Sequence, residues 1–195
     1  MSLFACLNTK RKQTMAKLYM NKLEGIFGQE DVIRKVEPSD GSTPLHVFFY
    51  YDLPEEGMLT AVTYGLSDGE FIGWKNAKPE LIISLETQDE SWGLAAAYFA
   101  AEFRGVKAFS YADLFTLDEP ISQESDMTGY FIFASAILEK EDAVIELPDK
   151  IIQLVGMYPL YKEEFDLMKR IGIKDFWHNK DYDIYNVNRV NLAKS

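Results

Sequence analysis

The sequence contains few of the residues that most often carry enzymatic chemistry. Among 195 residues there are one cysteine, Cys6, and two histidines, His46 and His178. A lone cysteine excludes an internal disulfide and a cysteine-ligated metal site, and it is typical of a reducing compartment. Neither histidine belongs to a Gly-x-Ser-x-Gly or His-Glu-x-x-His pattern, the arrangements that couple a histidine to a nucleophile or to zinc. We expect structural or surface roles for both histidines, no catalytic residue, no metal and no cofactor.

Long apolar runs and a glycine-rich phosphate loop are also missing. No apolar run reaches the roughly 20 residues that a membrane span requires. The basic residues 10–12 follow the segment Leu3–Cys6 instead of preceding it, so this segment does not have the order of a secretory signal. The segment Gly65–Gly69 lacks the lysine and the glycine spacing of a phosphate-binding loop. We expect a cytoplasmic protein without a membrane partner.

Positive charge is scarce as well. The chain has 20 Lys and Arg against 31 Asp and Glu, which gives a formal net charge of -11. Binding to a phosphate backbone needs clustered cations, so a nucleic-acid partner is not expected. The acidic balance agrees either with simple solubility or with a basic protein partner, and of these two solubility is the more general explanation.

Aromatic residues are abundant, and they indicate a substantial core. The sequence has 13 Phe, 11 Tyr and 3 Trp, and a chain of this length buries roughly 70% of its unfolded surface. We expect one domain over residues 15–195, including a polar C-terminal tail, preceded by an N-terminal extension at residues 1–14. Met15 is an alternative start of translation, and Cys6, in the extension, is not expected to act as a nucleophile.

Hydrophobic periodicity predicts a mixed arrangement of strands and helices. The runs rich in aromatic and β-branched residues, which predict strands, are His46–Tyr51, Met58–Tyr64, Glu80–Glu86, Tyr130–Leu138 and Ile151–Met157. Apolar residues at helical spacing predict helices over Met15–Phe27 and from Thr87 to Gly105, where Thr87 and Glu90 match a capping box. The segment between Val106 and Gly129 is long, acidic and loop-like.

The stretch Ile151–Trp177 contains a third helix after a strand. Pro159 is expected at the first helical position, with Glu163 and Glu164 in the first turn and Gly172 as the C-terminal cap. Because some strands are consecutive and others are separated by helices, we predict an α+β fold with a single domain and a mixed β-sheet packed by about three helices.

Several of these segments together resemble the suppressor-of-fused-like (SUFU) domain family. They share the order and spacing of the family's motifs, and they are Thr63–Ser67, Pro79–Leu85, Ile151–Met157, Pro159–Glu164 and Asn188–Asn191. The length corresponds to the short bacterial type. The resemblance implies a protein-binding domain, acting as an immunity or regulatory protein that neutralises a partner such as a toxin with a basic surface.

The candidate partner-binding residues lie in two segments. Tyr161, Glu163 and Glu164 match the family motif, and the long acidic loop supplies Asp118, Glu119, Glu124 and Asp126. Glu163 and Asp166 also share a helix face at three-residue spacing, so the alternative function is a hydrolase that uses carboxylates near Glu163. Acidic residues at a helix start already have an electrostatic explanation, and we expect a binding protein and not an enzyme. The identity of the partner and the oligomeric state stay open.

Overall fold

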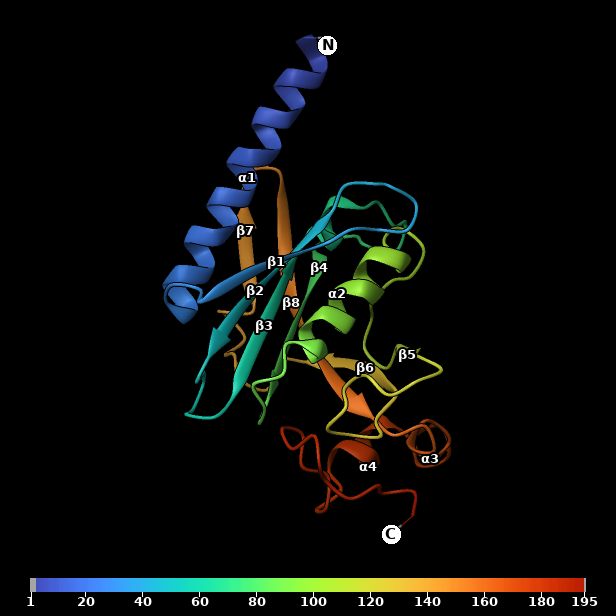
Figure 1. Ribbon diagram of the computed structural model, residues 1–195. Helices are drawn as coiled ribbons and strands as arrows, with labels where there is room; N and C mark the ends of the chain where they lie inside the picture. The colour runs from blue at the N-terminus through green and yellow to red at the C-terminus, as the bar shows by residue number, and fades with distance from the viewer. Residues whose placement is uncertain (1–2, 195) are drawn as a thin grey trace.

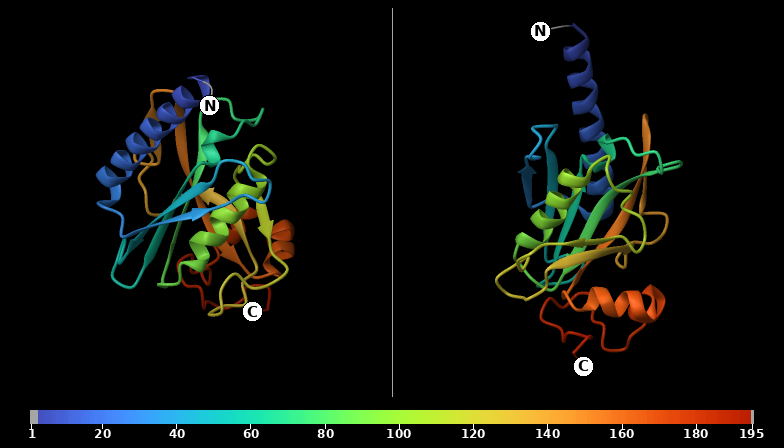
Figure 2. Two further views of the ribbon diagram at one scale, coloured as in Figure 1. Left: turned by 45° about the horizontal axis from the view of Figure 1, so that its top comes forward. Right: turned by 90° about the vertical axis from the view of Figure 1, so that its right-hand side faces the viewer.

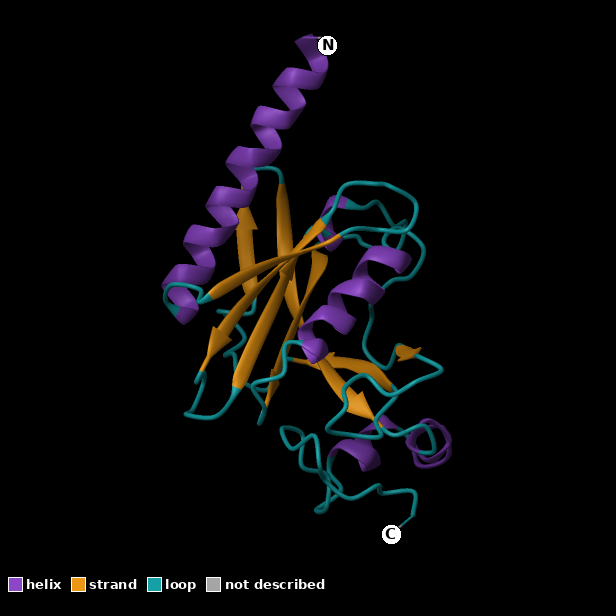
Figure 3. Ribbon diagram, in the orientation of Figure 1, coloured by secondary structure: helices purple, strands orange, loops and turns teal. Residues whose placement is uncertain are grey.

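An eight-stranded mixed β-sheet forms the centre of this computed structural model, which describes the backbone of residues 3–194 and the side chains of residues 14–194 (Figures 1 and 3). In chain order the strands are β1 (Val32–Val36), β2 (Leu45–Tyr51), β3 (Leu59–Tyr64), β4 (Lys78–Leu85), β5 (Leu114–Thr116), β6 (Gly129–Ala134), β7 (Val144–Leu147) and β8 (Lys150–Leu160). Their order across the sheet is β1-β2-β3-β4-β8-β6-β5, with β7 also paired to β8. The single α+β domain with a mixed sheet is therefore confirmed.

Strand β8 holds the two halves of the sheet together. It runs parallel to β4 and antiparallel to both β7 and β6. The expectation that Pro159 begins a helix is wrong, because Pro159 lies inside β8 opposite Tyr130 of β6. The pairing of β8 with β4 ends at Gly156, so the missing N–H of Pro159 costs no ladder bond on that side.

Two helices cover opposite faces of the sheet. These two are α1 (Leu3–Phe27) and α2 (Ser91–Phe103), and the shorter helices α3 (Glu164–Ile171) and α4 (Ile173–Trp177) follow the last strand. Helix α2 packs on one face, with Phe49, Ala61 and Ile83 in its core, and α1 packs on the other face against Phe48, Val62 and Ile82. The alternation of neighbouring residues between the two cores follows from the two-residue period of a strand. Figure 2 shows the same two-sided arrangement from two further directions.

Gly93 allows α2 to approach the sheet closely. A Cβ at this position would lie 2.6 Å from the Cβ of Ala61 and 2.6 Å from a ring carbon of Phe49. The predicted capping box at the start of this helix is wrong. Helix α2 begins at Ser91 without a side-chain cap, because the Glu90 carboxylate instead binds Arg34 at 2.7 Å and the hydroxyl of Tyr51 at 2.6 Å.

Helix α1 is longer than the periodicity indicated. It begins at Leu3 instead of Met15, and its first turns extend beyond the sheet (Figures 1 and 2). Cys6 lies in these turns, ahead of the described side chains. The second half of α1 packs on the sheet through Tyr19, Leu23 and Phe27, which are buried. None of the helices over residues 3–194 is long and apolar enough to cross a membrane.

The C-terminal end of the chain forms a third core at the far end of the sheet from the start of α1 (Figure 1). Helices α3 and α4 pack with Phe131, Tyr158 and the tail residues Tyr182 and Leu192. The polar tail is therefore fixed to the domain through its few apolar side chains.

Candidate functional site

A buried carboxylate fixes the turn that follows β3. Glu80, in β4, is completely buried and accepts four hydrogen bonds from the turn region. Its Oε1 accepts from the backbone N–H groups of Gly65 (2.7 Å) and Ser67 (2.9 Å) and from the Ser67 hydroxyl (2.7 Å). Its Oε2 accepts from the Thr63 hydroxyl at 2.7 Å. Gly65 has φ 124°, a conformation that favours glycine.

The environment of Glu80 acts on its pKa in two directions. Burial raises the pKa of Glu80, and the hydrogen bonds from Ser67, Thr63 and Gly65 oppose this rise without cancelling it. Lys150 closes the outer side of the turn, because its Nζ donates to the Ser67 hydroxyl at 2.8 Å and to Asp68 at 2.6 Å. The arrangement orders the chain that leads from β3 to β4.

A second buried carboxylate fixes the C-terminal tail. Glu164, completely buried, forms a two-pronged ion pair with Arg189 at 2.5 and 2.7 Å. It also accepts from the backbone N–H groups of Tyr161 at 3.0 Å and Leu192 at 2.9 Å. The hydroxyl of Tyr161 donates to the carbonyl of Arg189 at 2.8 Å. Tyr161 and Glu164 are thus engaged inside the domain.

Glu163 has a different environment from its neighbour. It is exposed, and it binds Nζ of Lys194 at 2.9 Å and the side-chain amide of Asn191 at 3.0 Å. These contacts, led by the hydrogen bond from Lys194, lower the pKa of Glu163 to about 2. Asp166 pairs with Lys169 at 3.4 Å on the surface. The three carboxylates therefore do not converge on one another or on a cavity.

The two histidines lie apart. His46 is exposed in β2, where partial burial and the charge of Lys35 lower its pKa. His178 follows α4, and its Nδ1 lies 2.7 Å from the carbonyl of Lys174. Within residues 14–194 no group of three or more His, Cys, Asp or Glu side chains is arranged to hold a metal ion.

All four predicted carboxylates of the acidic loop are exposed, and one of them, Glu124, also has a structural role. Glu124 accepts from the Thr87 hydroxyl at 2.5 Å and from the indole N–H of Trp92 at 2.8 Å, so it anchors the loop to the start of α2. Asp118, Glu119 and Asp126 are exposed. The loop and Ser91 border a polar groove of about 460 Å³ that includes Glu119 and Asp126. Of the acidic residues predicted to bind a partner, the structure therefore brings Glu119 and Asp126 together at one groove.

A second groove lies where the β3–β4 connection meets the α2–β5 connection. It has a volume of about 410 Å³ and is lined by residues 73–77, Pro79, residues 108–111, Gln153 and Val155. The indole N–H of Trp74 donates to the carbonyl of Ala108 at 2.7 Å and joins the two walls. Lys75 is the only charged residue in the lining. We call this hollow the Trp74–Tyr111 groove.

The two connections that form the Trp74–Tyr111 groove carry large exposed apolar side chains. Tyr111, in its wall, is 56% exposed, and Ile72 and Val106, in the same two connections, are 99% and 67% exposed. Such a concentration of exposed apolar side chains is typical of an interaction surface. The lining contains no carboxylate, histidine or cysteine and is formed largely by apolar and small side chains.

Comparison with known proteins identifies the family. The model of the suppressor of fused protein (SUFU) family matches residues 41–190. This chain belongs to the suppressor of fused family. The SUFU match includes both buried carboxylates, Glu80 and Glu164, together with Arg189, so the family segments named above correspond to the contacts that hold the SUFU domain together.

Individual relatives of this SUFU chain are distant in sequence and similar in length. Immunity protein YqcF of Bacillus subtilis (strain 168) is 19% identical over 188 residues, which span 91% of this chain and 96% of that protein. The structure of a SUFU homologue from Neisseria gonorrhoeae FA 1090 has a TM-score of 0.70 at 14% identity, over 92% of this chain and 97% of its own. A short bacterial member of the family therefore shares the architecture.

Two further structures extend the comparison. A chain of the Sufu–Fu complex has a TM-score of 0.60 at 10% identity, covering 91% of both chains. Drosophila Suppressor of Fused has a TM-score of 0.61 at 10% identity, covering 92% of this chain and 51% of that one. At such identities these structures establish the shared fold alone.

Sequence reasoning did not find the Trp74–Tyr111 groove. Its walls come from two connections that are separated in the sequence by β4 and α2 and that meet in the fold, where the indole N–H of Trp74 donates to the carbonyl of Ala108. The available signal was the length of the segment after Val106, because long loops often carry function. The sequence predicts partner contacts in the acidic second half of that segment, whereas the groove is lined by residues 108–111 in its first half.

Proposed function

We propose that this SUFU-type protein is an immunity or regulatory protein that acts by binding a partner protein, and that it needs no cofactor. The observation that carries the proposal is the Trp74–Tyr111 groove, with its exposed apolar border and its single charged residue. The name of the relative YqcF supports an immunity role. The similar structure of a Sufu–Fu complex supports recognition of a protein.

The partner proposed is a toxin with a basic surface, neutralised in the cytoplasm. The net charge of -11 favours association with a basic protein. Asp118, Glu119 and Asp126 contribute exposed negative charge at the α2 end opposite the groove. We place the apolar contacts in the groove and assign to the acidic loop the attraction of the partner.

Binding is preferred to hydrolysis for a geometric reason. A hydrolase near Glu163 needs two carboxylates facing a shared cavity, with the pKa of one raised to serve as an acid. Glu164 is instead buried against Arg189, and the pKa of Glu163 is lowered by Lys194. These contacts support a structural role for both, and we leave Glu164 and Tyr161 out of the proposed interface.

The test is co-purification with the product of a neighbouring gene that encodes a large secreted toxin. Co-expression is expected to give a stable complex and to restore growth of cells that express the toxin domain. The double variant Ile72→Lys/Tyr111→Ala should weaken the complex by tenfold or more, because it removes exposed apolar contacts. The matched control is Val190→Lys, since Val190 is also exposed and lies in the tail, outside the lining of the groove.

Both variants should keep the thermal transition of the parent protein, because none of the three substituted residues is buried. Equal affinities of the parent and the groove variant would remove the groove from the interface. Hydrolysis of a substrate that stops with Glu163→Gln while the pair Ile72→Lys/Tyr111→Ala has no effect would replace the binding proposal with the enzymatic one.

A further inference from the structure

The outer edge of β7 is open and has a groove beside it. Strand β7 pairs with β8 on one side only. On its other side a groove of about 450 Å³ is bordered by Lys22 and Ile26 of α1, by Glu141 and Asp142, and by residues 144–146 of β7. We call this the β7-edge groove. It lies on the face covered by α1 and is separate from the Trp74–Tyr111 groove.

The register shows which backbone groups point into the β7-edge groove. Leu154 N–H donates to the carbonyl of Ala143 at 2.8 Å, which makes the facing residues Val144 and Gln153 a pair that exchanges no hydrogen bonds. The next pair, Ile145 and Ile152, is a hydrogen-bonded pair between β7 and β8. The pair after it, Glu146 and Ile151, again exchanges no hydrogen bonds. The N–H and C=O of Glu146 and the C=O of Val144 are therefore directed away from β8, toward the groove.

The side chains beside this edge are partly apolar. Val144 is 38% exposed and Ile151, opposite Glu146 in the register, is 41% exposed. Ile26 adds a half-buried aliphatic side chain from α1. An incoming strand would therefore find outward backbone groups together with apolar surface, the combination by which sheets recognise extended segments.

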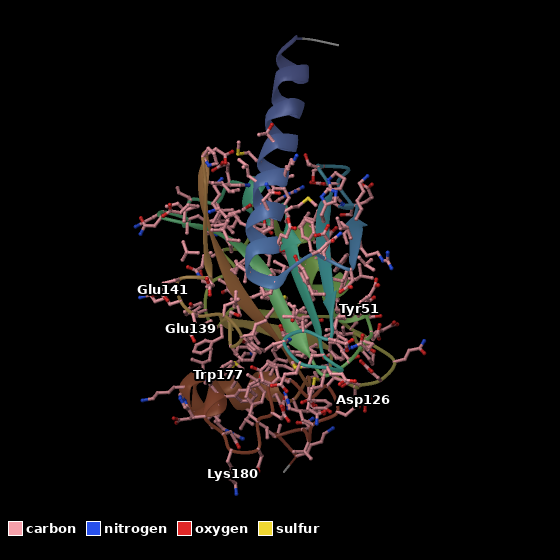
Figure 4. All side chains as sticks on the ribbon, turned by 90° about the vertical axis from the view of Figure 1, so that its left-hand side faces the viewer. Tyr51, Asp126, Glu139, Glu141, Trp177 and Lys180 are labelled. Atoms are coloured by element: carbon pink, nitrogen blue, oxygen red, sulfur yellow. The ribbon has the colours of Figure 1, made fainter. Side chains whose placement is uncertain are left out.

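The charge of the groove selects the occupant. Glu141, Asp142 and Glu146 are exposed and line it, and Lys22 is the one cation among its lining residues. Glu139 and Lys140 are exposed next to them and add no net charge, and Figure 4 shows Glu139 and Glu141 on the same side of the molecule, away from Asp126 of the acidic loop. A second copy of the chain is disfavoured, because pairing β7 with another β7 would bring these carboxylates together.

We propose that the β7-edge groove binds an extended segment of a partner protein in which lysine or arginine alternates with aliphatic residues, added as a further strand to β7. Successive side chains of the added strand point to opposite faces, so its aliphatic side chains contact Ile26 on the face covered by α1. Its basic side chains lie toward Glu146 on the opposite face and toward Glu141 and Asp142 just before β7. The proposal adds a surface to the one in the proposed function, and it holds or fails independently of the Trp74–Tyr111 groove.

The probe for the test is an end-blocked octapeptide of alternating valine and lysine, with the valine–glutamate octapeptide as its comparison. Binding is followed by fluorescence anisotropy and by amide exchange in NMR spectra. The basic peptide should bind and slow exchange of the Glu146 amide, and the acidic peptide should not bind. Glu141→Lys/Asp142→Lys should lower affinity tenfold or more. The charge-matched control Glu55→Lys/Glu56→Lys, in the exposed β2–β3 turn, should change it less than twofold.

The backbone contribution is tested with Glu146→Pro against Glu146→Gln. Because the N–H of Glu146 faces outward, proline removes a donor from the groove and leaves the bonds to β8 in place. The proline variant should bind the basic peptide at least tenfold more weakly than the glutamine variant, at an unchanged melting temperature. Should the proline variant fail to fold, exchange of the Glu146 amide in the parent protein decides.

Three results would overturn the proposal. The first is equal binding by the proline and glutamine variants, and the second is peptide-induced protection only at residues outside β7. The third is self-association of the protein through the β7 edge, detected by sedimentation and abolished by Glu146→Pro, which would make a second copy the occupant.

Discussion

Two neighbouring glutamates show how strongly the environment decides the role of a residue. Glu163 and Glu164 are adjacent at the start of α3, yet one is exposed and the other is completely buried. A buried carboxylate needs a partner to offset its lost hydration. Arg189 supplies that partner with two parallel hydrogen bonds, and its guanidinium also lies 4.7 Å from the ring centroid of Tyr182.

Removing the arginine should therefore destabilise the domain. We expect Arg189→Ala to lower the free energy of unfolding by about 3–5 kcal/mol, because it leaves the carboxylate of Glu164 buried without its counter-charge. Arg189→Lys should recover only part of the loss, since an ammonium cannot form the paired bonds. Lys194→Ala, which breaks the exposed pair with Glu163, should cause little change. Urea unfolding measures all three, and a neutral effect of Arg189→Ala would contradict the assignment.

The pKa of Glu163 offers a direct test of its surface contacts. Lys194 and Asn191 lower that pKa to about 2, so Lys194→Ala should move it upward, toward the ordinary range of a glutamate. A lowered folded-state pKa gives stability that is present above the unfolded-state pKa and is lost as the pH falls toward 2. Carbon NMR of the side-chain carboxyl group against pH measures the shift. An unchanged pKa in the variant would show that the pair does not form in solution.

At the scale of elements, Glu80 in β4 fixes the turn at Gly65–Ser67, which directly follows β3. We expect Glu80→Leu to lower the free energy of unfolding by about 3 kcal/mol or more, because several buried donors lose their acceptor and each costs about 1–3 kcal/mol. Glu80→Gln keeps one oxygen acceptor and should cost less. Thermal and urea unfolding of the two variants give the comparison, and equal losses would contradict the role assigned to these hydrogen bonds.

Glu80 also predicts a dependence on pH. Because burial raises its folded-state pKa above the unfolded-state pKa, the free energy of unfolding should fall as the pH rises from the unfolded-state pKa to the folded-state pKa. Glu80→Gln cannot ionise, so it should remove this part of the slope. The measurement is the free energy of unfolding of both proteins across the acidic range.

The sequence predicted the strongly periodic elements and missed those that depend on distant contacts. Helix α2 and the hairpin of β2 and β3 were predicted because their apolar residues repeat clearly. Strand β1 (Val32–Val36) was not predicted, because it is short and contains the charged residues Arg34 and Lys35. Its pairing with β2 makes this segment a strand.

The partner of Glu164 could not be predicted either. Arg189 lies 25 residues away in a tail that looks polar and irregular. Local sequence gives helix-start glutamates an electrostatic role, and only the fold shows that the tail returns over α3. The exposed positions Asp118, Glu119 and Asp126 stay predictions of partner contact.

For the molecule as a whole, the net charge of -11 predicts the kinetics of association with a basic partner. We expect Glu119→Lys/Asp126→Lys to slow association by about tenfold at low salt, because the exposed loop steers the partner through its field. The control Glu55→Lys/Glu56→Lys changes the net charge equally, to -7 in both variants. Its two residues lie in the β2–β3 turn, outside the acidic loop. Stopped-flow measurements of the co-purified partner at two salt concentrations separate the effects. Equal slowing in both variants would assign steering to net charge alone, and no slowing in either would exclude an electrostatic contribution from the loop.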